Sequence, residues 1–432
     1  MASSDLTVLR SIVEVTKGVT PDDSVKATGT LTASALADTE TVTINGKVYT
    51  LQTALTELDG HVKIGADLTA TLVNLKNAIN RLGGVVGTDY ATATTAHPTV
   101  EATASDATTL TVRARNGGLA GNALTTTEGS VTAAWGAATL TGGTNSTITA
   151  LKQVRYTGES LNYNIENVKS AEITPTRVDT DLIQVSAAAS GDINFELSYG
   201  SFDDYIEAVF CGTWTSDVLQ NGTVLRTFTF QKHFPDMTVP QFHTFKGCAI
   251  EGMSLKMEIG KLVEGSFSVM AFGLAVGTAQ IAGATFPAVS TTQPMNAVTN
   301  VQDFSIDGVP YTGCISSLSV DMKNNIRAIM CIGSIEARDM KLGTLEVTGD
   351  MNFYFNEGTN YAAFVAGTEF SFTFNLVDLD GNLYAFDFSR VKFESGEVVA
   401  GGKNSDVMFN AKWRGLYDGT DARVLQLTRT PV

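Results

Sequence analysis

Two short patterns occur twice in this chain, in the same order and at nearly the same separation. The pattern GDINF at residues 191–195 recurs as GDMNF at residues 349–353, 158 positions further along the chain. Val154-x-Tyr156-Thr157-Gly158 returns as Val309-x-Tyr311-Thr312-Gly313, 155 positions later when 311 is compared with 156. Two matches in one order indicate two copies of one domain.

From residue 149 onward, apolar and polar residues alternate in long runs. Leu318, Val320 and Met322 alternate with polar residues, and Val263, Phe267 and Val269 alternate with Glu264, Ser266 and Ser268. A period of two places alternate side chains on opposite faces of a strand. The sequence therefore predicts a mainly β (α+β) fold for the repeated part.

Residues 27–144 differ from the rest, because they are rich in Thr, Ala and Gly and almost free of Phe. Asn45-Gly46 lies between two β-branched runs, which is a strong hairpin signal. Asp67 is a candidate N-cap for a helix whose apolar face includes Leu72 and Leu82 and which ends at Gly83-Gly84. We predict a small α+β domain inserted in the chain.

Several classes of site are absent from the sequence. The formal net charge of −16 argues against a protein that holds nucleic acid. The four cysteines are far apart, which favours buried free thiols over a zinc site, and His233 and His243 share no predicted face. No catalytic motif, metal set or cofactor motif is found, and no apolar run is long enough to cross a membrane.

One long block, residues 154–214, resembles the phage tail tube proteins. It contains YTGESL, a KSxEI turn, the strand SGDINFELSYG and a short helix that begins near Asp203-Asp204. Residues 14–21 (EVTKGVTP) are similar to the opening segment of that family, and residues 391–413 are similar to its last strands. The second copy is more divergent, and RAIM at residues 327–330 replaces its KSxEI equivalent.

The resemblance implies two tandem tail-tube β-sandwich/barrel domains, each with a short helix. The expected boundaries are 1–26 and 149–280 for a discontinuous first tube domain, and 303–432 for the second. Residues 27–148 would form the inserted decoration domain, and residues 281–302 would form a linker.

The resemblance also implies a virion structural protein of a long, non-contractile tail, with no enzymatic activity. If related rings hold six tube domains, a chain with two should form homotrimeric, pseudo-hexameric rings that stack into a tube. The implied partners are copies of the chain, a tape measure protein in the lumen, a tail terminator, and tail tip or baseplate proteins. DNA would be transient cargo, and membrane binding is not expected. The first ten residues lack a signal peptide, so we expect synthesis in the host cytoplasm and a final location in the virion tail.

An acidic lumen would repel DNA and keep it moving. Strand alternation and local context nominate six lumen-facing acids, although each could instead face solvent on the outside: Asp192, Glu196, Glu258, Glu264, Asp321 and Asp350. The inserted domain would project outward.

Two other functions stay open at this point. Thr/Gly-rich β domains also occur in adhesion proteins, so a baseplate or receptor-binding protein is one alternative. A hydrolase of cell-surface glycans is another, although the sequence shows no specific carboxylate pair for it.

Overall fold

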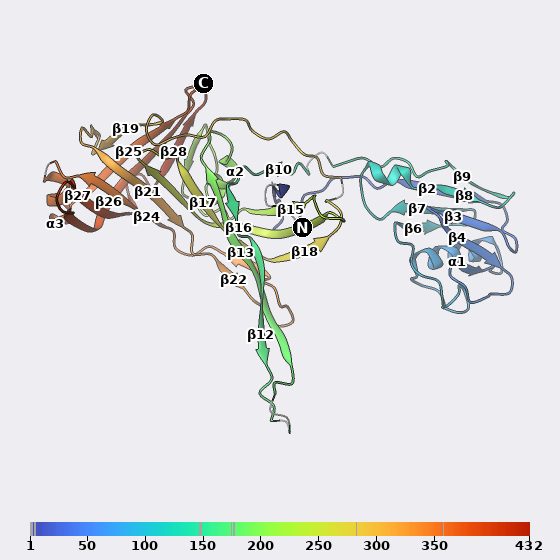
Figure 1. Ribbon diagram of the computed structural model, residues 1–432. Helices are drawn as coiled ribbons and strands as arrows, with labels where there is room; N and C mark the ends of the chain where they lie inside the picture. Colours follow the sequence, from blue (N-terminus) through green and yellow to red (C-terminus); the bar gives the residue numbers. More distant parts are fainter. Residues whose placement is uncertain are drawn as a thin grey trace. The chain divides into compact units, whose positions relative to one another are not determined.

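A computed structural model describes residues 3, 6–146, 149–173, 175, 178–281, 283–356 and 358–432. The chain forms two compact units (Figure 1). The inserted unit comprises residues 22–151 and 279–286, and the larger unit comprises residues 1–21, 152–278 and 287–432. Strands dominate both, and the described part contains three α-helices, so the predicted mainly β fold is confirmed.

In its described residues, the inserted unit contains two four-stranded sheets, one α-helix and one short 3-10 helix around its own core. One sheet has the order β6-β7-β2-β9 and the other the order β5-β4-β3-β8. The elements are β2 (Thr28–Ala33), β3 (Thr41–Ile44), β4 (Lys47–Gln52), β5 (His61–Lys63), α1 (Leu68–Asn80), β6 (Val100–Ser105), β7 (Thr109–Ala114), a short 3-10 helix (Leu119–Ala123), β8 (Thr126–Glu128) and β9 (Ala133–Trp135).

Two local predictions for this unit can be compared with the structure. Asn45 and Gly46 adopt φ of 42° and 80° in the turn between β3 and β4, as the hairpin signal predicts. The Asp67 side chain accepts a hydrogen bond from the Ala70 amide and caps α1. The predicted end is wrong, because α1 stops at Asn80 with Arg81 in the left-handed region, and Leu82 is 76% exposed.

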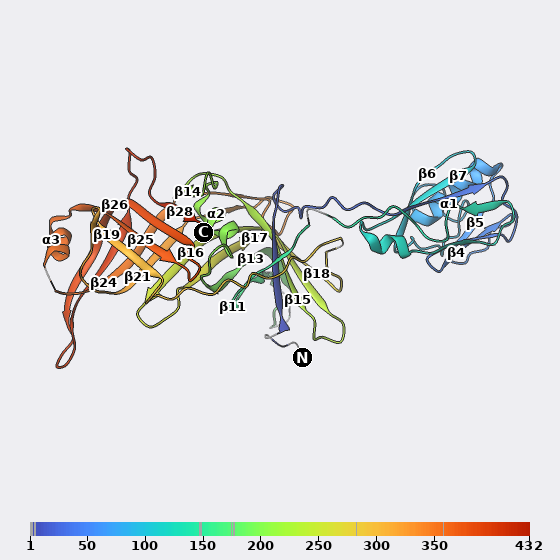
Figure 2. The ribbon, with the colours of Figure 1, turned by 90° about the horizontal axis from the view of Figure 1, so that it is seen from above.

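The larger unit is built on one 18-stranded antiparallel sheet (Figures 1 and 2). Its first repeat contains β1 (Val8–Val13), β10 (Lys152–Gln153), β11 (Gly158–Glu159), β12 (Asn162–Lys169), β13 (Leu182–Glu196), α2 (Asp203–Phe210), β14 (Val218–Gln220), β15 (Thr227–Phe234), β16 (Gln241–Glu258), β17 (Glu264–Ala271) and β18 (Gly273–Gly277). Its second repeat contains β19 (Val301–Ile306), β20 (Val309–Pro310), β21 (Ile315–Lys323), β24 (Glu346–Tyr354), α3 (Thr359–Ala366), β25 (Glu369–Val377), β26 (Leu383–Ala400), β27 (Val407–Gly415) and β28 (Gln426–Thr430). A separate two-stranded hairpin, β22 (Arg327–Ile329) with β23 (Asp339–Lys341), lies between β21 and β24.

The strand pairings repeat along the chain. In the first repeat β13 and β16 both pair with β17, and β15 pairs with β1 and β16; in the second, β24 and β26 both pair with β27, and β25 pairs with β19 and β26. The bulge after Ile250 in β16 returns after Phe393 in β26. We call two residues counterparts when they occupy the same position in the strand pairings of the first and the second repeat.

Counterparts share core side chains that the sequence comparison missed. Phe228 pairs with Cys248 and Phe370 with Val391, while Phe230 pairs with Phe245 and Phe372 with Phe388. Phe372 and Phe388 stack with ring centroids 4.3 Å apart. Turns of different length change the number of residues that separates counterparts, so these core residues do not recur at one constant spacing in the sequence.

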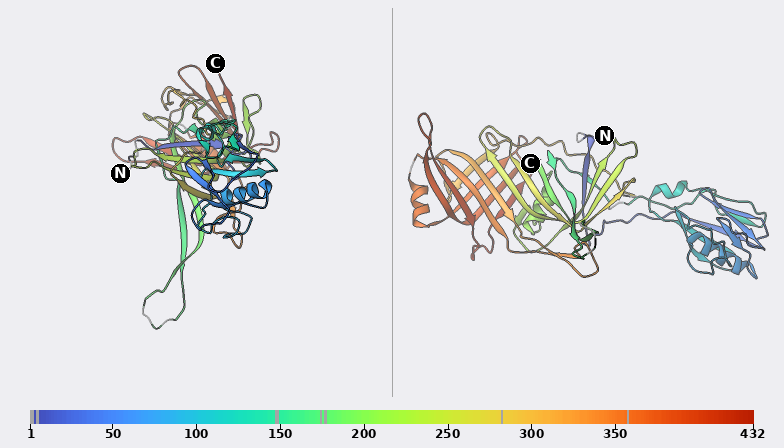
Figure 3. Two further views of the ribbon diagram at one scale, coloured as in Figure 1. Left: turned by 90° about the vertical axis from the view of Figure 1, so that its right-hand side faces the viewer. Right: turned by 60° about the horizontal axis from the view of Figure 1, so that its bottom comes forward.

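The two repeats are joined directly by a ladder between β16 and β21 (Figure 3). Residues 252–258 pair with residues 323–317, and Met253, Leu255 and Met257 are buried with Leu318, Val320 and Met322 in one core cluster. The predicted alternation of residues 318–322 is therefore confirmed. The core of the larger unit is shared between the repeats.

A second contact joins the repeats through α2, which starts with Asp203 and Asp204 as predicted. Arg429 donates to Asp203 at 2.6 Å and to Asp217 at 2.7 Å, beside the β14–β28 pairing. The hydroxyl of Tyr384 also contacts Asp203. Burial, and then the Asp203 carboxylate, raises the pKa of Tyr384 well above its ordinary value.

The repeated glycine of the GDxNF pattern lies where strands approach closely. A Cβ on Gly349 would lie 2.0 Å from the Ser319 carbonyl oxygen and 2.7 Å from the Trp413 ring. A Cβ on Gly191 would lie 2.5 Å from the backbone of Leu161. The close approach explains why both copies keep glycine.

We predict that Gly349→Ala destabilises the larger unit by about 1–3 kcal/mol, because the added methyl overpacks a rigid site. Gly277→Ala is the matched control, since its Cβ would meet no atom within 4 Å. Urea unfolding of both variants measures the difference. Equal stability of the two variants would contradict the packing argument.

Candidate functional site

One face of the large sheet is polar across strands from both repeats. Directly opposite residues of antiparallel strands lie on the same face, and Asn194, Ser266, Ser254 and Asp321 form one such row across β13, β17, β16 and β21. The next row contains Glu196, Glu264, Lys256 and Ser319. We call this surface the polar face; it consists of Asp192, Asn194, Glu196, Ser254, Lys256, Glu258, Glu264, Ser266, Ser268, Ser317, Ser319, Asp321, Lys323, Glu346, Thr348, Asp350, Asn352, Asn410, Lys412 and Arg414.

All six acids nominated from the sequence lie on the polar face. Asp192 and Glu196 are on β13, and Glu258 and Glu264 are on β16 and β17. Asp321 and Asp350 are on β21 and β24 of the second repeat. The opposite face carries the core, where α2 packs with Tyr205, Ile206 and Val209 buried.

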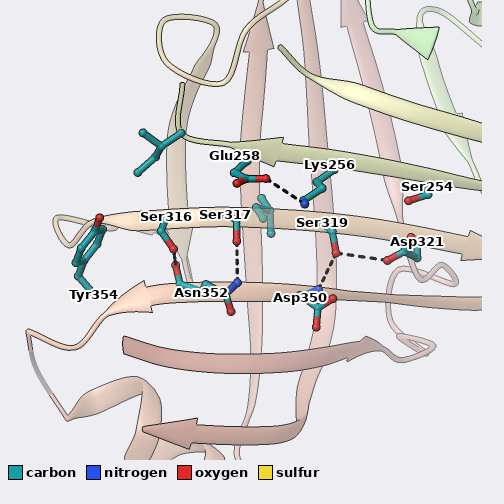
Figure 4. Close-up of a pocket in the computed structure, with 12 residues that line it drawn as sticks. Ser254, Lys256, Glu258, Ser316, Ser317, Ser319, Asp321, Asp350, Asn352 and Tyr354 are labelled. Carbon is teal, nitrogen blue, oxygen red and sulfur yellow. Dashed lines mark hydrogen bonds and ion pairs between the residues drawn. The ribbon is translucent and has the colours of Figure 1, made fainter. Parts of the chain in front are cut away.

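Short polar side chains connect the strands of this face (Figure 4). Ser319 Oγ accepts from the Asp350 amide at 2.9 Å and lies 3.4 Å from Asp321 Oδ2. Asn352 Nδ2 donates to Ser317 Oγ at 2.8 Å. The Asp192 amide donates to Ser160 Oγ at 2.9 Å, which reproduces in the first repeat the bond between Asp350 and Ser319.

The cations of the polar face have acidic neighbours. Lys256 Nζ lies 3.0 Å from Glu258 Oε2, and Lys261 at the end of the strand lies 3.0 Å from the same oxygen. Lys412 lies opposite Asp350 in the β24–β27 ladder. Hydrogen bonds from Lys261 and Lys256 hold the pKa of the Glu258 carboxyl below its ordinary value of 4.5.

Two shallow hollows lie on the polar face. One, of about 700 Å³, is lined by the polar ends of β16, β21 and β24, including Glu258, Asp321 and Asp350. The other, of about 400 Å³, includes Glu196, Lys256 and Glu264. The described residues contain no group of three His, Cys, Asp or Glu side chains placed to hold a metal ion.

The histidines and cysteines lie apart from this face or from one another. His233 stacks on Phe242, and His243 lies edge-on to Phe234. His243 lies opposite Lys232, which precedes His233 in β15 and therefore points to the other side of the sheet. His233 and His243 thus point to opposite faces.

Cys211 and Cys248 are buried, but Cys314 and Cys331 are exposed free thiols, so the prediction of four buried cysteines is wrong for two.

A family model described as phage tail tube protein matches residues 126–415, which is more than half of the chain. The chain belongs to the phage tail tube protein family. Proteins of this family are structural components of the virion tail, and they self-assemble into a tube. A comparison with curated proteins gives no match. Among the described residues, no helix has both the length and the apolar character needed to cross a membrane.

The segments that resemble tail tube proteins contain two buried charged contacts. Glu159 of the YTGESL run lies 2.6 Å from the Lys232 ammonium, and both side chains are largely buried. Glu14 is 7% exposed and accepts from the Gly18 amide at 2.6 Å and the Gly247 amide at 3.0 Å. In the sequence, Glu14 and Glu159 stand out only as parts of the segments that resemble tail tube proteins. Their role in the structure is to hold separate strands together.

The charge contacts of Glu258 give a pH prediction. Lys261→Gln should raise the pKa of Glu258, because the largest cause of its depression is removed. A carboxyl whose pKa is depressed on folding stabilises the fold above its unfolded pKa, and this contribution disappears as pH falls below about 4.5 through the folded pKa. Carboxyl ¹³C NMR of Glu258 measures the shift.

Lys403→Gln is the matched control, because this exposed lysine is not among the cations that act on Glu258. It should leave the titration of Glu258 unchanged. An unchanged Glu258 titration in Lys261→Gln would refute the assignment.

Proposed function

We propose that this chain is the major tail tube subunit and that three copies close a pseudo-hexameric ring. Its role is structural, and the rings stack into the conduit through which DNA leaves the virion. The family match supports a tail tube role. The ring geometry is inferred from the internal symmetry of the chain.

The observation that carries the proposal is the β16–β21 ladder. It joins the second half of β16 in the first repeat to β21 in the second repeat. The counterparts of these two segments are residues 395–401, mostly in β26, and residues 158–164 around β11 and β12. In the described part of the chain, each of these segments pairs along one edge only, with β27 and β13 respectively.

Burial differs sharply between the counterparts. Leu255 in the β16–β21 ladder is 1% exposed, whereas its counterpart Val398 is 38% exposed, and Val399 beside it is 37% exposed. An apolar sheet edge with unused backbone groups is a template for another strand. A second copy offers the complementary edge, so the pairing inside one chain can be repeated between chains.

The internal ladder also specifies the register between copies. Ser254 lies opposite Asp321. After the bulge, pairing with the next strand resumes at Gly252 in β16 and at Ser395 in β26. Ser254 and Glu397 each lie two residues further on, so they are counterparts. The counterpart of Asp321 is Asn162, because Asp321 pairs with Thr348, Asn162 pairs with Ser190, and residues 190 and 348 precede the repeated glycines. Glu397 should therefore lie opposite Asn162 of the next copy.

Each chain contains two repeats, so a ring of three copies contains six repeats. In this ring, the seam between two copies is equivalent to the seam inside each chain. Rings stack by head-to-tail contacts into an open filament, since such association does not close on itself. A tape measure protein inside the tube, a terminator, and tail tip or baseplate proteins are the expected partners. The inserted unit projects outward as decoration, and its presence on the outside favours a tail without a contractile sheath.

The polar face is the proposed lumen wall. The apolar face is covered by its own core, so ring closure leaves the polar face to line the channel. Its acids Asp192, Glu196, Glu258, Glu264, Asp321 and Asp350 would repel the phosphate backbone. The described cations of this face also have acidic neighbours: Glu258 beside Lys256, Glu346 opposite Lys323, Asp350 opposite Lys412 and Glu394 beside Arg414. Such neighbours reduce attachment of DNA during passage.

We predict that Glu397→Cys combined with Asn162→Cys forms a disulfide between copies. Directly opposite residues of antiparallel strands have Cα atoms about 4.5–5.5 Å apart, within the range that a disulfide spans. In a Cys314→Ser, Cys331→Ser background, oxidised particles should run on a non-reducing gel as covalent trimers that reduction returns to single chains.

Two matched pairs test the register of this seam. Ser254→Cys with Asp321→Cys should cross-link inside one chain and leave the mass of a single chain. Glu397→Cys with Asn164→Cys is displaced by two residues and should cross-link far less. Assembled tubes in which the first pair stays unlinked would overturn the proposed seam.

The lumen assignment gives a separate prediction. Asp192 is exposed and lies opposite Ser268, so Asp192→Lys adds one cation per copy to the polar face. Tubes of this variant should retain duplex DNA at low salt and release it steeply as salt rises. The control Asp406→Lys changes the same charge in the exposed turn between β26 and β27. Equal retention of DNA fragments by both tubes, measured by cosedimentation, would contradict an inward polar face.

A further inference from the structure

Each repeat carries a hairpin arm at the same place in its sheet. The first arm, residues 165–187, includes the end of β12 and the start of β13, which pair with each other. The second arm, residues 324–345, joins β21 to β24; the two arms contain 23 and 22 residues. Both arms pair in the same register. Val168 lies opposite Ile183 as Arg327 lies opposite Lys341, and Lys169 lies opposite Leu182 as Ala328 lies opposite Met340.

The second arm is docked on the first repeat. Ile326 and Met340 form a buried cluster with Ala249, against which Met270 and Phe272 also pack. Asn324 is 4% exposed, donates its amide N–H to the Glu251 carbonyl at 2.8 Å and donates Nδ2 to the Val209 carbonyl at 2.8 Å.

Polar contacts extend along the second arm. Glu336 accepts from the Tyr163 hydroxyl at 2.8 Å, and Lys17 donates to Asp339 at 2.8 Å. The Ala187 amide donates to the Ile335 carbonyl at 2.7 Å. This arm therefore lies against the sheet through apolar, charged and backbone contacts together.

The first arm has the same register but an exposed surface. Its ribbon leaves the body of the larger unit (Figure 1). Met340 is fully buried, whereas its counterpart Leu182 is 57% exposed. The other large apolar side chains along its described residues are also exposed; they are Ile165, Val168, Ile173, Val178, Ile183 and Val185.

We propose that the first arm docks on the second repeat of the neighbouring copy, as the second arm docks on the first repeat inside the chain. The inference rests on the proposed ring, because the register between copies places the second repeat of one chain beside the first repeat of the next. The occupant of the second repeat's sheet end is thus a second copy of this chain.

The chemistry of the two partners agrees with this assignment. The counterparts of Ala249 and Met270, which hold the second arm, are Lys392 and Arg414, and these two lie opposite each other in the β26–β27 ladder. Both are partly exposed. Their aliphatic stems can pack on Leu182 while their charged ends reach the polar side of the arm.

The first arm has an acidic excess that can add to the charge contacts of Lys392 and Arg414. Inside the chain, Lys392 lies opposite Glu369, and Arg414 lies 3.2 Å from Glu394. Residues 165–187 contain four acids, Glu166, Glu172, Asp179 and Asp181, against two cations, Lys169 and Arg177, and Arg177 lies outside the described residues. The second arm has the opposite balance, with Arg327, Arg338 and Lys341 against Glu336 and Asp339. The acidic arm thus meets Lys392 and Arg414, whereas the basic arm meets the uncharged Ala249 and Met270.

A photo-cross-linking amino acid at Leu182 of the full chain tests the proposal. Tubes are assembled from a mixture of ¹⁵N-labelled and unlabelled copies, irradiated and mapped by mass spectrometry. We expect cross-links from residue 182 to peptides containing Lys392 or Arg414, with mixed isotopes that show two copies. The same amino acid at Leu379, which is 73% exposed in another turn, is the control and should not give these products.

The outcomes separate the arm from the ring. If tubes form but residue 182 cross-links to any other region, such as an adjacent ring or the inserted unit, the arm proposal is wrong and the tube subunit stands. If the unmodified chain forms neither rings nor tubes, the proposed function itself fails.

A charge exchange tests the same contact independently. Lys392→Glu should raise the chain concentration needed for half-maximal assembly by roughly tenfold, because like charges then face each other. Asp181→Lys in the same chain should restore assembly. Lys403→Glu, an equal change in an exposed turn, should have no effect. Equal assembly of the Lys392→Glu and Lys403→Glu variants would overturn the charge contact.

Discussion

The larger unit depends on one backbone ladder between β16 and β21. It joins two copies of one domain edge to edge, so that a single core extends through both. Net gains per backbone hydrogen bond are small, about 0.5–1.5 kcal/mol. Burial of Met253, Leu255 and Met257 against Leu318, Val320 and Met322 adds the larger apolar contribution. Among the described residues, the strand segments equivalent to the two sides of this ladder, residues 395–401 and 158–164, each pair along one edge only.

Those two edges explain how internal duplication and assembly are related. A sheet with complementary open edges either aggregates or pairs with a defined partner. In the proposed ring, the internal seam is the template for the register between chains, because each open segment is the counterpart of a segment that is paired inside the chain. The arms follow the same logic, since Met340 is buried in its own chain and Leu182 is exposed.

The polar face follows from strand alternation carried across several strands. Single strands predicted that Glu264 would point away from Phe267, and six acids were nominated in this way. The sequence could not tell that these acids share one face, because that depends on the pairing of β17 with β13 and of β16 with β21. It also missed that Glu258 lies 3.0 Å from the Lys256 ammonium.

Local signals determined local structure well. The Asn45-Gly46 hairpin, the Asp67 cap, the acidic start of α2 and the alternation of residues 318–322 all depend on neighbouring residues, so the sequence predicted them correctly. The end of α1 was misplaced because Arg81 adopts the left-handed conformation two residues before the glycines. The counterpart phenylalanines escaped notice because turn lengths differ between the repeats.

The sequence by itself determined that this chain is mainly β, that it contains a repeated pattern and that it resembles phage tail tube proteins. Only the tertiary structure decided how the two repeats of the chain join, which strand edges stay open, and why one arm is buried while its counterpart is exposed. These properties come from contacts between residues far apart in the chain, such as Ser254 with Asp321. A strand has the same β-propensity and the same alternation of side chains whichever strand it pairs with. These two properties therefore do not encode which sheet edges meet.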